Sequence, residues 1–161
     1  MSRFCLKMLF AVGVLVIGLN GAAQAPKPYG SPIGVEDARK VAVAAVAEAR
    51  KNNWFMAVAV VDPSGTLVYY EKMDNTQTGS ANVAVEKART SALYKRPTKV
   101  FQDTVAGGGA GLRVLGLPGA VPLEGGIPLE VDGKIVGAIG VSGGVSDQDG
   151  QCAQAGAGAL K

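Results

Sequence analysis

Hydrophobic residues recur along the chain at a helical spacing in two long segments. Between residues 35 and 52 they recur at i, i+3 and i+4, with acidic residues in the first turn and basic residues in the last, which is typical of an amphipathic helix. The same spacing over residues 80–94 predicts a second helix, which must end near Arg96 because Pro97 follows. The apolar stripe of the first helix is mostly alanine, so we expect this helix to lie close against a sheet.

Two pairs of segments rich in β-branched and aromatic residues predict two hairpins, because a turn sequence joins the members of each pair. The pairs are residues 54–61 with 66–73, joined at Asp62-Pro63-Ser64-Gly65, and residues 127–131 with 134–141, joined at Asp132-Gly133. A further short strand over residues 121–124 would bring the sheet to about five strands. Since both strong pairs are hairpins, the sheet should be largely antiparallel.

Shorter segments complete the predicted order of elements. Thr98 is expected to cap a short helix that reaches about Val105, and residues 107–111 are expected to form a flexible glycine-rich loop. Ser146 and Asp149 have the spacing of a capping box at the start of a last helix. The predicted fold class is α+β, a single layered domain with helices packed on the sheet and a profilin-like or PAS-like shape.

The first 25 residues have the pattern of a secretory signal peptide. Arg3 and Lys7 precede an apolar run over residues 8–19, about 12 residues long, whereas a membrane-spanning helix needs about 20. The small residues Ala23 and Ala25 follow, and cleavage is expected after either of them. We therefore expect a leader over 1–25, an extended arm over 26–34 and a folded domain over 35–161. The protein should be periplasmic or secreted, with no stable membrane anchor after cleavage.

Composition narrows the chemistry that the chain can perform. The 161 residues include no histidine, which excludes Ser-His-Asp and Cys-His catalysis, histidine-containing zinc sites and histidine-ligated heme. Loss of Arg3 and Lys7 with the leader leaves 14 of the 16 basic residues against 13 acidic ones, with no basic run interleaved with aromatics, so no nucleic-acid partner is expected. Cys152 would be the only cysteine left, and we expect it to be a small buried hydrophobe.

Two glycine turns are the main candidates for a binding site. Glu124-Gly125-Gly126 precedes the second hairpin and Ser142-Gly143-Gly144 follows it, so antiparallel pairing places both turns at one edge of the sheet. The second turn leads into a helix N-terminus, whose N–H groups attract a carboxylate or phosphate. A purely conformational role for these glycines is equally compatible with the spacing. Lys87 and Thr90, on one face of the second helix, are further candidates, although such a pair usually faces solvent.

Six segments together resemble the GlcG/HbpS heme-binding family, whose members are of a heme-degrading type. They are residues 57–65, Lys72-Met73-Asp74, Lys87-Ala88-Arg89-Thr90, Arg96-Pro97-Thr98, residues 124–128 and residues 137–144. The resemblance spans residues 35–160, nearly the whole chain after the leader. It implies an α+β domain with an antiparallel sheet, a tendency to form homo-oligomers, and a small-molecule ligand such as heme or an organic acid.

The resemblance leads to one main hypothesis about function and two alternatives. The main hypothesis is an exported heme-binding protein for heme handling or redox sensing, with heme docked near residues 124–126 and 142–144. The alternatives are a hydrolase or isomerase of a small organic acid, and an accessory protein without a ligand. In the enzyme, Lys87 or Arg89 would hold the carboxylate, with Glu124 or Asp74 as the base. No catalytic residue is assigned.

Without histidine, an iron ligand must come from another residue type. The remaining kinds of ligand in the sequence are Tyr69, Tyr70, Met73, Thr90 and Cys152. None of them is assigned as a metal ligand.

Overall fold

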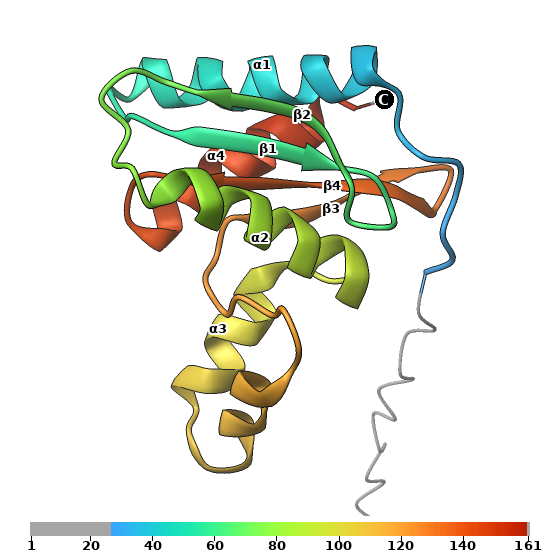
Figure 1. Ribbon diagram of the computed structural model, residues 1–161, viewed down its shortest axis with the longest axis vertical. Helices are drawn as coiled ribbons and strands as arrows, with labels where there is room; N and C mark the ends of the chain where they lie inside the picture. Colours follow the sequence, from blue (N-terminus) through green and yellow to red (C-terminus); the bar gives the residue numbers. More distant parts are fainter. Residues whose placement is uncertain (1–26, 161) are drawn as a thin grey trace, which may run out of the picture.

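An antiparallel sheet of four strands lies between helices on both of its faces (Figure 1). The computed structural model describes residues 27–160, so the expected leader lies outside the described residues. The elements in chain order are α1 (Val35–Lys51), β1 (Ala57–Val61), β2 (Leu67–Lys72), α2 (Ser80–Tyr94), α3 (Thr98–Ala106), the 3₁₀ helix η1 (Gly109–Gly116), β3 (Gly126–Val131), β4 (Lys134–Ser142) and α4 (Ser146–Gly158). The strand order is β2-β1-β4-β3, which makes β3 one edge of the sheet. The predicted α+β class is confirmed.

The central strand β1 shows how the sequence separates the two faces of the sheet. Val58 and Val60 belong to the core that α1 and α4 cover, whereas the alternate residues of β1 pack with the buried alanines of α2. Small residues on this second face allow a close approach. A Cβ atom on Gly140 would lie 2.1 Å from the carbonyl oxygen of Ala84, so α2 lies against the sheet without large side chains between them.

The chain between α3 and β3 differs from the prediction in two places. Of the glycine-rich segment 107–111 expected to be a flexible loop, residues 109–111 begin η1, and Gly108 before it has a φ of 65°, which suits glycine. Residues 121–124 form no strand: Val121 N donates to Thr90 Oγ1 at 2.9 Å, Pro122 has no N–H group, and Glu124 N donates to Gln102 Oε1 at 2.9 Å.

Two predicted helix caps are wrong. Thr98 is already helical, with Pro97 at the N-cap, and its hydroxyl accepts the N–H of Gly126 at 2.8 Å. At the start of α4 the N-cap is Val145, whose N–H donates to Gln148 Oε1 at 3.2 Å, and Asp149 accepts from Gly144 N instead of capping the helix. Thr98 and Asp149 therefore connect their helices to the glycine turns beside the sheet, Thr98 to Gly126 and Asp149 to Gly144.

The segment before α1 continues the sheet beyond the end of β1. Gly30 N and Ile33 N donate to the carbonyls of Ile135 and Val136 on β4, each at 2.8 Å. Tyr29 reaches across to α2, where its hydroxyl donates to the carbonyl oxygen of Ala92 at 2.9 Å. The segment is thus bonded to both β4 and the end of α2.

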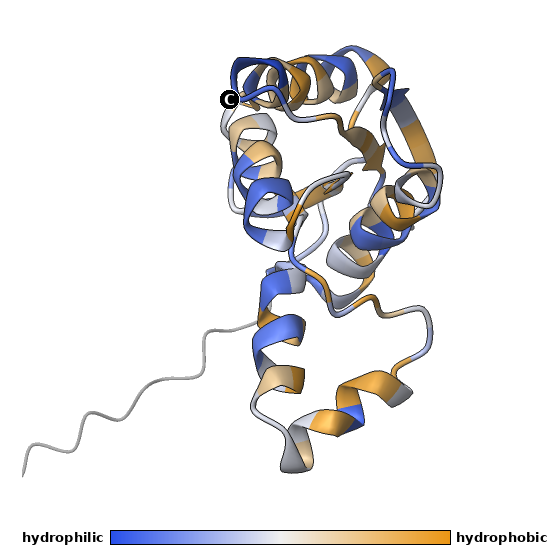
Figure 2. Cartoon of the chain, turned by 90° about the vertical axis from the view of Figure 1, so that its left-hand side faces the viewer, coloured by the Kyte–Doolittle hydropathy of each residue, from blue (hydrophilic) through white to orange (hydrophobic). Residues whose placement is uncertain are grey.

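α3 and η1 project from the layered body, as both ribbon views show (Figures 1 and 2). Two leucines of η1 are largely exposed, Leu112 at 50% and Leu115 at 63%. This projection therefore presents apolar side chains outside the main core. Among the residues that the structure describes, no helix is long and apolar enough to cross a membrane.

Candidate functional site

A buried ion pair lies behind the turn that precedes β3. Lys87 Nζ donates to Asp149 Oδ2 at 2.7 Å and to the carbonyl oxygen of Val141 at 3.1 Å. Asp149 Oδ1 accepts the N–H of Gly144 at 3.0 Å. The side chains of Lys87 and Asp149 are only 2% and 4% exposed. Lys87 therefore does not face solvent, as a lysine at this helix position usually does. The reason is that α2 turns this face onto the sheet.

Burial acts on both members of the pair in opposite directions. It lowers the pKa of Lys87 and raises the pKa of Asp149, because each charged form loses water, while the opposite charge of the partner counteracts both shifts. Such a pair contributes little net stability, but removal of one partner leaves an uncompensated charge in the interior. Through Lys87, the pair connects α2 to both β4 and α4.

Thr90, the other candidate on α2, is also buried. Its hydroxyl lies 2.8 Å from the carbonyl oxygen of Glu86 and 3.1 Å from that of Gly119, which share its one hydrogen, and it accepts the N–H of Val121 at 2.9 Å. It therefore fixes the chain that leads from η1 to Glu124.

The two glycine turns lie on either side of the ion pair but open into different cavities. The turn Glu124–Gly126 lines a cavity of about 440 Å³ beside α4. Gly143 and Gly144 line another, of about 270 Å³, together with Trp54 and Gln148. Ser142 pairs with Ala57 within the sheet and lines neither.

The N–H groups of the second turn are used within the protein. Gly144 N donates to Asp149 Oδ1 and Val145 N to Gln148 Oε1. The glycines are also required for packing: a Cβ atom on Gly143 would lie 2.1 Å from the carbonyl oxygen of Phe55. This turn thus has a structural role that the sequence pattern alone did not separate from anion binding.

The cavity beside α4, which we name the Glu124 cavity, contains charges of both signs. Its lining residues are Pro97, Lys99, Glu124, Gly125, Gly126, Ile127, Asp147, Gly150, Gln151 and Gln154. Glu124 Oε2 lies 3.4 Å from Lys99 Nζ, but it is buried and makes no hydrogen bond among the described residues. A Cβ atom on Gly150 would lie 2.4 Å from Glu124 Oε1, so the glycine leaves room for this carboxylate.

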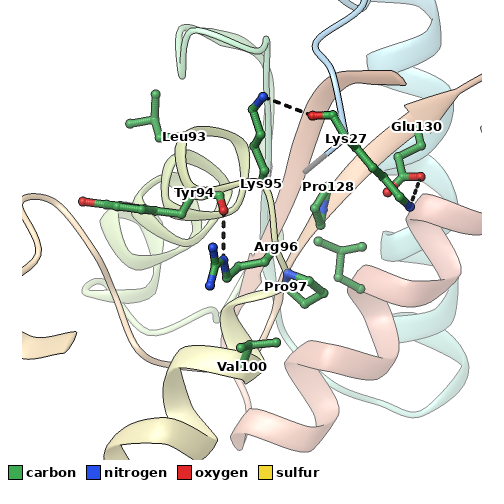
Figure 3. Close-up of a pocket in the computed structure, with 10 residues that line it drawn as sticks. Lys27, Leu93, Tyr94, Lys95, Arg96, Pro97, Val100, Pro128 and Glu130 are labelled. Carbon is green, nitrogen blue, oxygen red and sulfur yellow. Dashed lines mark hydrogen bonds and ion pairs between the residues drawn. The ribbon is translucent and has the colours of Figure 1, made fainter. Parts of the chain in front are cut away.

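A larger cavity of about 890 Å³, which we name the Arg96 cavity, lies along the rest of β3 (Figure 3). Its charged lining residues are Lys27, Lys95, Arg96 and Glu130, and its other lining residues are Leu93, Tyr94, Pro97, Val100, Ile127 and Pro128. Three cations against one carboxylate leave a surplus of positive charge. Pro97 and Ile127 line both this cavity and the Glu124 cavity, so the two cavities are neighbours at the β3 edge.

The cations of the Arg96 cavity differ in how they are held. Lys27 pairs with Glu130, and Lys95 Nζ lies 3.9 Å from the centre of the Tyr29 ring and donates to the carbonyl oxygen of Lys27 at 3.0 Å. Arg96 donates from Nε to the carbonyl oxygen of Tyr94 at 3.0 Å (Figure 3), and its exposed guanidinium lies 5.6 Å from the centre of the Phe101 ring. Sequence reasoning missed this cavity, although adjacent Lys95 and Arg96 at the end of a helix were visible.

The residue types that can ligate iron lie mostly away from both cavities. Tyr69 and Tyr70 are on β2, the opposite edge of the sheet from β3, and Met73 follows β2. Cys152 is fully buried, as expected, and burial raises the pKa of its thiol to about 12. Tyr94 does line the Arg96 cavity, and its hydroxyl donates to the carbonyl oxygen of Pro118 at 2.7 Å.

No described residues form a group of three or more histidine, cysteine or acidic side chains able to hold a metal ion. Arg89, the other residue considered for holding a carboxylate, donates to Gly65 O at 3.1 Å and to Glu86 Oε1 at 2.7 Å. It lines neither the Arg96 cavity nor the Glu124 cavity.

Comparisons with known proteins assign the chain to a family. Residues 33–158 match the sequence model of the family described as haem degrading protein HbpS-like, and the chain belongs to this family. The GlcG protein of Escherichia coli strain K12 is 43% identical over 95 residues, which cover 59% of this chain and 69% of GlcG.

Two solved structures of similar proteins share the fold. A double mutant of HbpS from Streptomyces reticuli is 30% identical, with a TM-score of 0.76, over 95% of this chain and 99% of that one. A PduOC:heme complex is also 30% identical, with a TM-score of 0.73, over 81% of this chain and 96% of the other. The expected membership of the GlcG/HbpS family is therefore confirmed.

Proposed function

We propose that this protein binds heme in the Arg96 cavity, and not at residues 124–126 and 142–144 where it was expected from the sequence, and that it serves in heme handling or redox sensing. The observation that carries the proposal is the composition of this cavity: apolar walls with a surplus of positive charge, in a volume of about 890 Å³. Heme is a flat, apolar ring that carries two carboxylates, so it needs both features. The heme complex of the similar PduOC structure supports the same class of ligand.

The lining residues fit the porphyrin ring and its carboxylates. Ile127 and Pro128 of β3 and Val100 of α3 present apolar surface, while the exposed guanidinium of Arg96 is placed to pair with a propionate. Tyr94 is the lining residue that can supply an oxygen ligand, which would require its hydroxyl to leave the Pro118 carbonyl. Bound heme would supply iron-centred redox chemistry. The chain itself would hold the ring edge and balance its charge.

The experiment that tests the proposal is a hemin titration of the purified protein, followed at the Soret band. We expect saturable binding and a shifted Soret maximum. Arg96→Met should weaken binding, whereas Arg113→Met, an exposed arginine of η1 outside the cavity, should bind hemin as the wild type does. Equal affinities for the two variants would place the heme elsewhere, and the lack of any saturable binding would overturn the proposed function.

We also propose export and self-association. Export is supported by the basic residues and apolar run within the first 25 residues. An intact mass that corresponds to a chain beginning at Gln24 or Pro26 would verify it.

Self-association is supported by the exposed leucines of η1, Leu112 and Leu115, which a second copy of the chain would cover. Light scattering should give a mass larger than that of a dimer.

A further inference from the structure

We propose that the Glu124 cavity is a second binding site, for a small zwitterion that carries both an ammonium group and a carboxylate. The first observation is Glu124 Oε2, a buried carboxylate oxygen with no hydrogen-bond donor among the described residues. A buried polar atom of this kind calls for a partner, because burial without one has a large desolvation cost. The oxygen belongs to a residue that lines a cavity of about 440 Å³, which is within the size range of small-molecule sites.

The fold holds Glu124 in position from several sides. Glu124 N donates to Gln102 Oε1 at 2.9 Å, and the following Gly125 accepts the N–H of Val141 at 2.9 Å. The Lys87 ammonium lies directly behind this turn, since a Cβ atom on Gly125 would be 3.0 Å from its Nζ atom. The backbone at Glu124 is therefore fixed, and its carboxylate lies between Lys99 and Gly150.

The charges that line the cavity select the class of ligand. Glu124 and Asp147 supply two negative charges, and Lys99 supplies one positive charge. An anion would add to the negative excess, whereas an ammonium group would pair with Glu124 Oε2. Lys99 is half exposed and also pairs with Asp103 Oδ1 at 3.1 Å, and it is the cation of this cavity that a carboxylate on the same molecule would meet. A metal ion is disfavoured as the occupant, because the described residues contain no metal-binding cluster and Lys99 Nζ is 3.4 Å from the oxygen concerned.

Three probes of matched length separate the contributions of the two charged groups. They are 4-aminobutanoate, which has both groups, 4-hydroxybutanoate, which lacks the ammonium, and butylamine, which lacks the carboxylate. Binding to the purified protein is measured by titration calorimetry and by amide chemical-shift changes. We expect 4-aminobutanoate to bind at least about tenfold more tightly than either of the others.

Variants then assign the effect to this cavity. Glu124→Gln should weaken 4-aminobutanoate binding at least about tenfold, and Lys99→Met should reduce it to the level of butylamine. Glu86→Gln, an ion-paired carboxylate of α2 that does not line the cavity, should bind like the wild type. Thermal unfolding of each variant verifies that it is folded, and if Glu124→Gln is not, the Lys99→Met result decides.

Several outcomes would overturn the proposal. Tightest binding of 4-hydroxybutanoate would indicate an organic-acid site, and unchanged binding in a folded Glu124→Gln variant would place the ligand elsewhere. Absence of binding by all three probes would mean that a bound water suffices for Glu124. None of these results bears on heme, because hemin binding to the Arg96 cavity is measured separately and should survive Glu124→Gln.

Discussion

The two ends of β3 share a strand but differ in charge. At its start, the Glu124 cavity places two carboxylates and one lysine beside α4, whereas along the rest of the strand the Arg96 cavity places three cations and one carboxylate beside the end of α2. The residues common to both, Pro97 and Ile127, are apolar. We therefore expect the two ends of one strand edge to prefer ligands of different chemistry, because the charged residues that line the two cavities differ.

The glycines at the Glu124 end are required by packing rather than by a ligand. A Cβ atom on Gly126 would lie 2.4 Å from the carbonyl oxygen of Lys87, and one on Gly125 would lie 2.5 Å from that of Val141. In contrast, no glycine lines the Arg96 cavity. Substitutions at these glycines therefore test the fold, whereas charged side chains test the sites.

The largest effect is expected from breaking the buried ion pair behind the Glu124 turn. Asp149→Leu leaves the Lys87 charge without its partner in the interior, which should lower the free energy of unfolding by about 3–5 kcal/mol in urea denaturation. Lys87→Met combined with Asp149→Leu should recover much of that loss, because no charge is then buried. A double variant as unstable as the single one would contradict the ion-pair explanation. Glu86→Gln, which breaks the exposed pair with Arg89, is the matched control.

Cys152 provides the next largest effect and tests whether iron could be ligated away from β3. With a thiol pKa of about 12, the thiolate fraction at pH 8 is about 1 in 10⁴, so a disulfide reagent should modify the folded protein about a thousandfold more slowly than a free cysteine. Rapid modification at pH 8 without unfolding would show that the thiol is accessible and would restore it as a ligand candidate.

The raised pKa of Cys152 also has a consequence for stability. Between the ordinary thiol pKa of about 9 and the folded value of about 12, the native state retains a proton that the unfolded state has lost. This contribution to the free energy of unfolding is complete below about pH 9 and is lost as the pH rises toward 12. The free energy of unfolding, measured by urea denaturation at several pH values across this range, should therefore depend less steeply on pH for Cys152→Ala than for the wild type.

A smaller effect is expected from the glycine at the start of β3. Gly126→Ala introduces a methyl group against the Lys87 carbonyl and should lower the free energy of unfolding by about 1–3 kcal/mol. Gly116→Ala, where a Cβ atom meets nothing within 4 Å, is the control. If both substitutions were tolerated equally, the close approach of α2 to β3 would be wrong.

The smallest of these effects concerns the basic end itself. Arg96→Met removes one charge from the surplus in the cavity and should weaken hemin binding about fivefold, which corresponds to about 1 kcal/mol for a partly exposed pair. Titration of Arg96→Met and Arg113→Met side by side, at two salt concentrations, provides the measurement. A larger loss for Arg113→Met would move the heme to the α3–η1 projection.

Most of the fold could be predicted from local sequence patterns. The amphipathic spacing over residues 35–52, the proline after Arg96 and the Asp132-Gly133 turn each fix a boundary by local physical chemistry, and α2 was predicted at its observed bounds of Ser80–Tyr94. Two of the errors arose where a side chain bonds outside its own helix. Thr98 and Asp149 resemble helix caps, but their partners are Gly126, Gly144 and Lys87.

The candidate site could be predicted only in part, for the same reason. The segment Glu124–Gly126 does line a cavity, and sequence order placed it at the sheet edge. The Arg96 cavity combines Lys27, Lys95 and Glu130 from three separate segments, so no local pattern contains it. The buried partnership of Lys87 with Asp149, 62 positions apart, is likewise visible only once the chain has folded.

The most direct measurement is the position of the bound heme relative to β3. Ferric heme broadens the methyl NMR signals of nearby residues, and isoleucine, leucine and valine methyls cover the whole molecule. We predict that hemin broadens the signals of Leu93, Val100 and Ile127, which line the Arg96 cavity, and leaves Val43 on α1 and Leu67 on β2 sharp. Broadening at Val43 or Leu67 with sharp signals at Val100 and Ile127 would contradict the account.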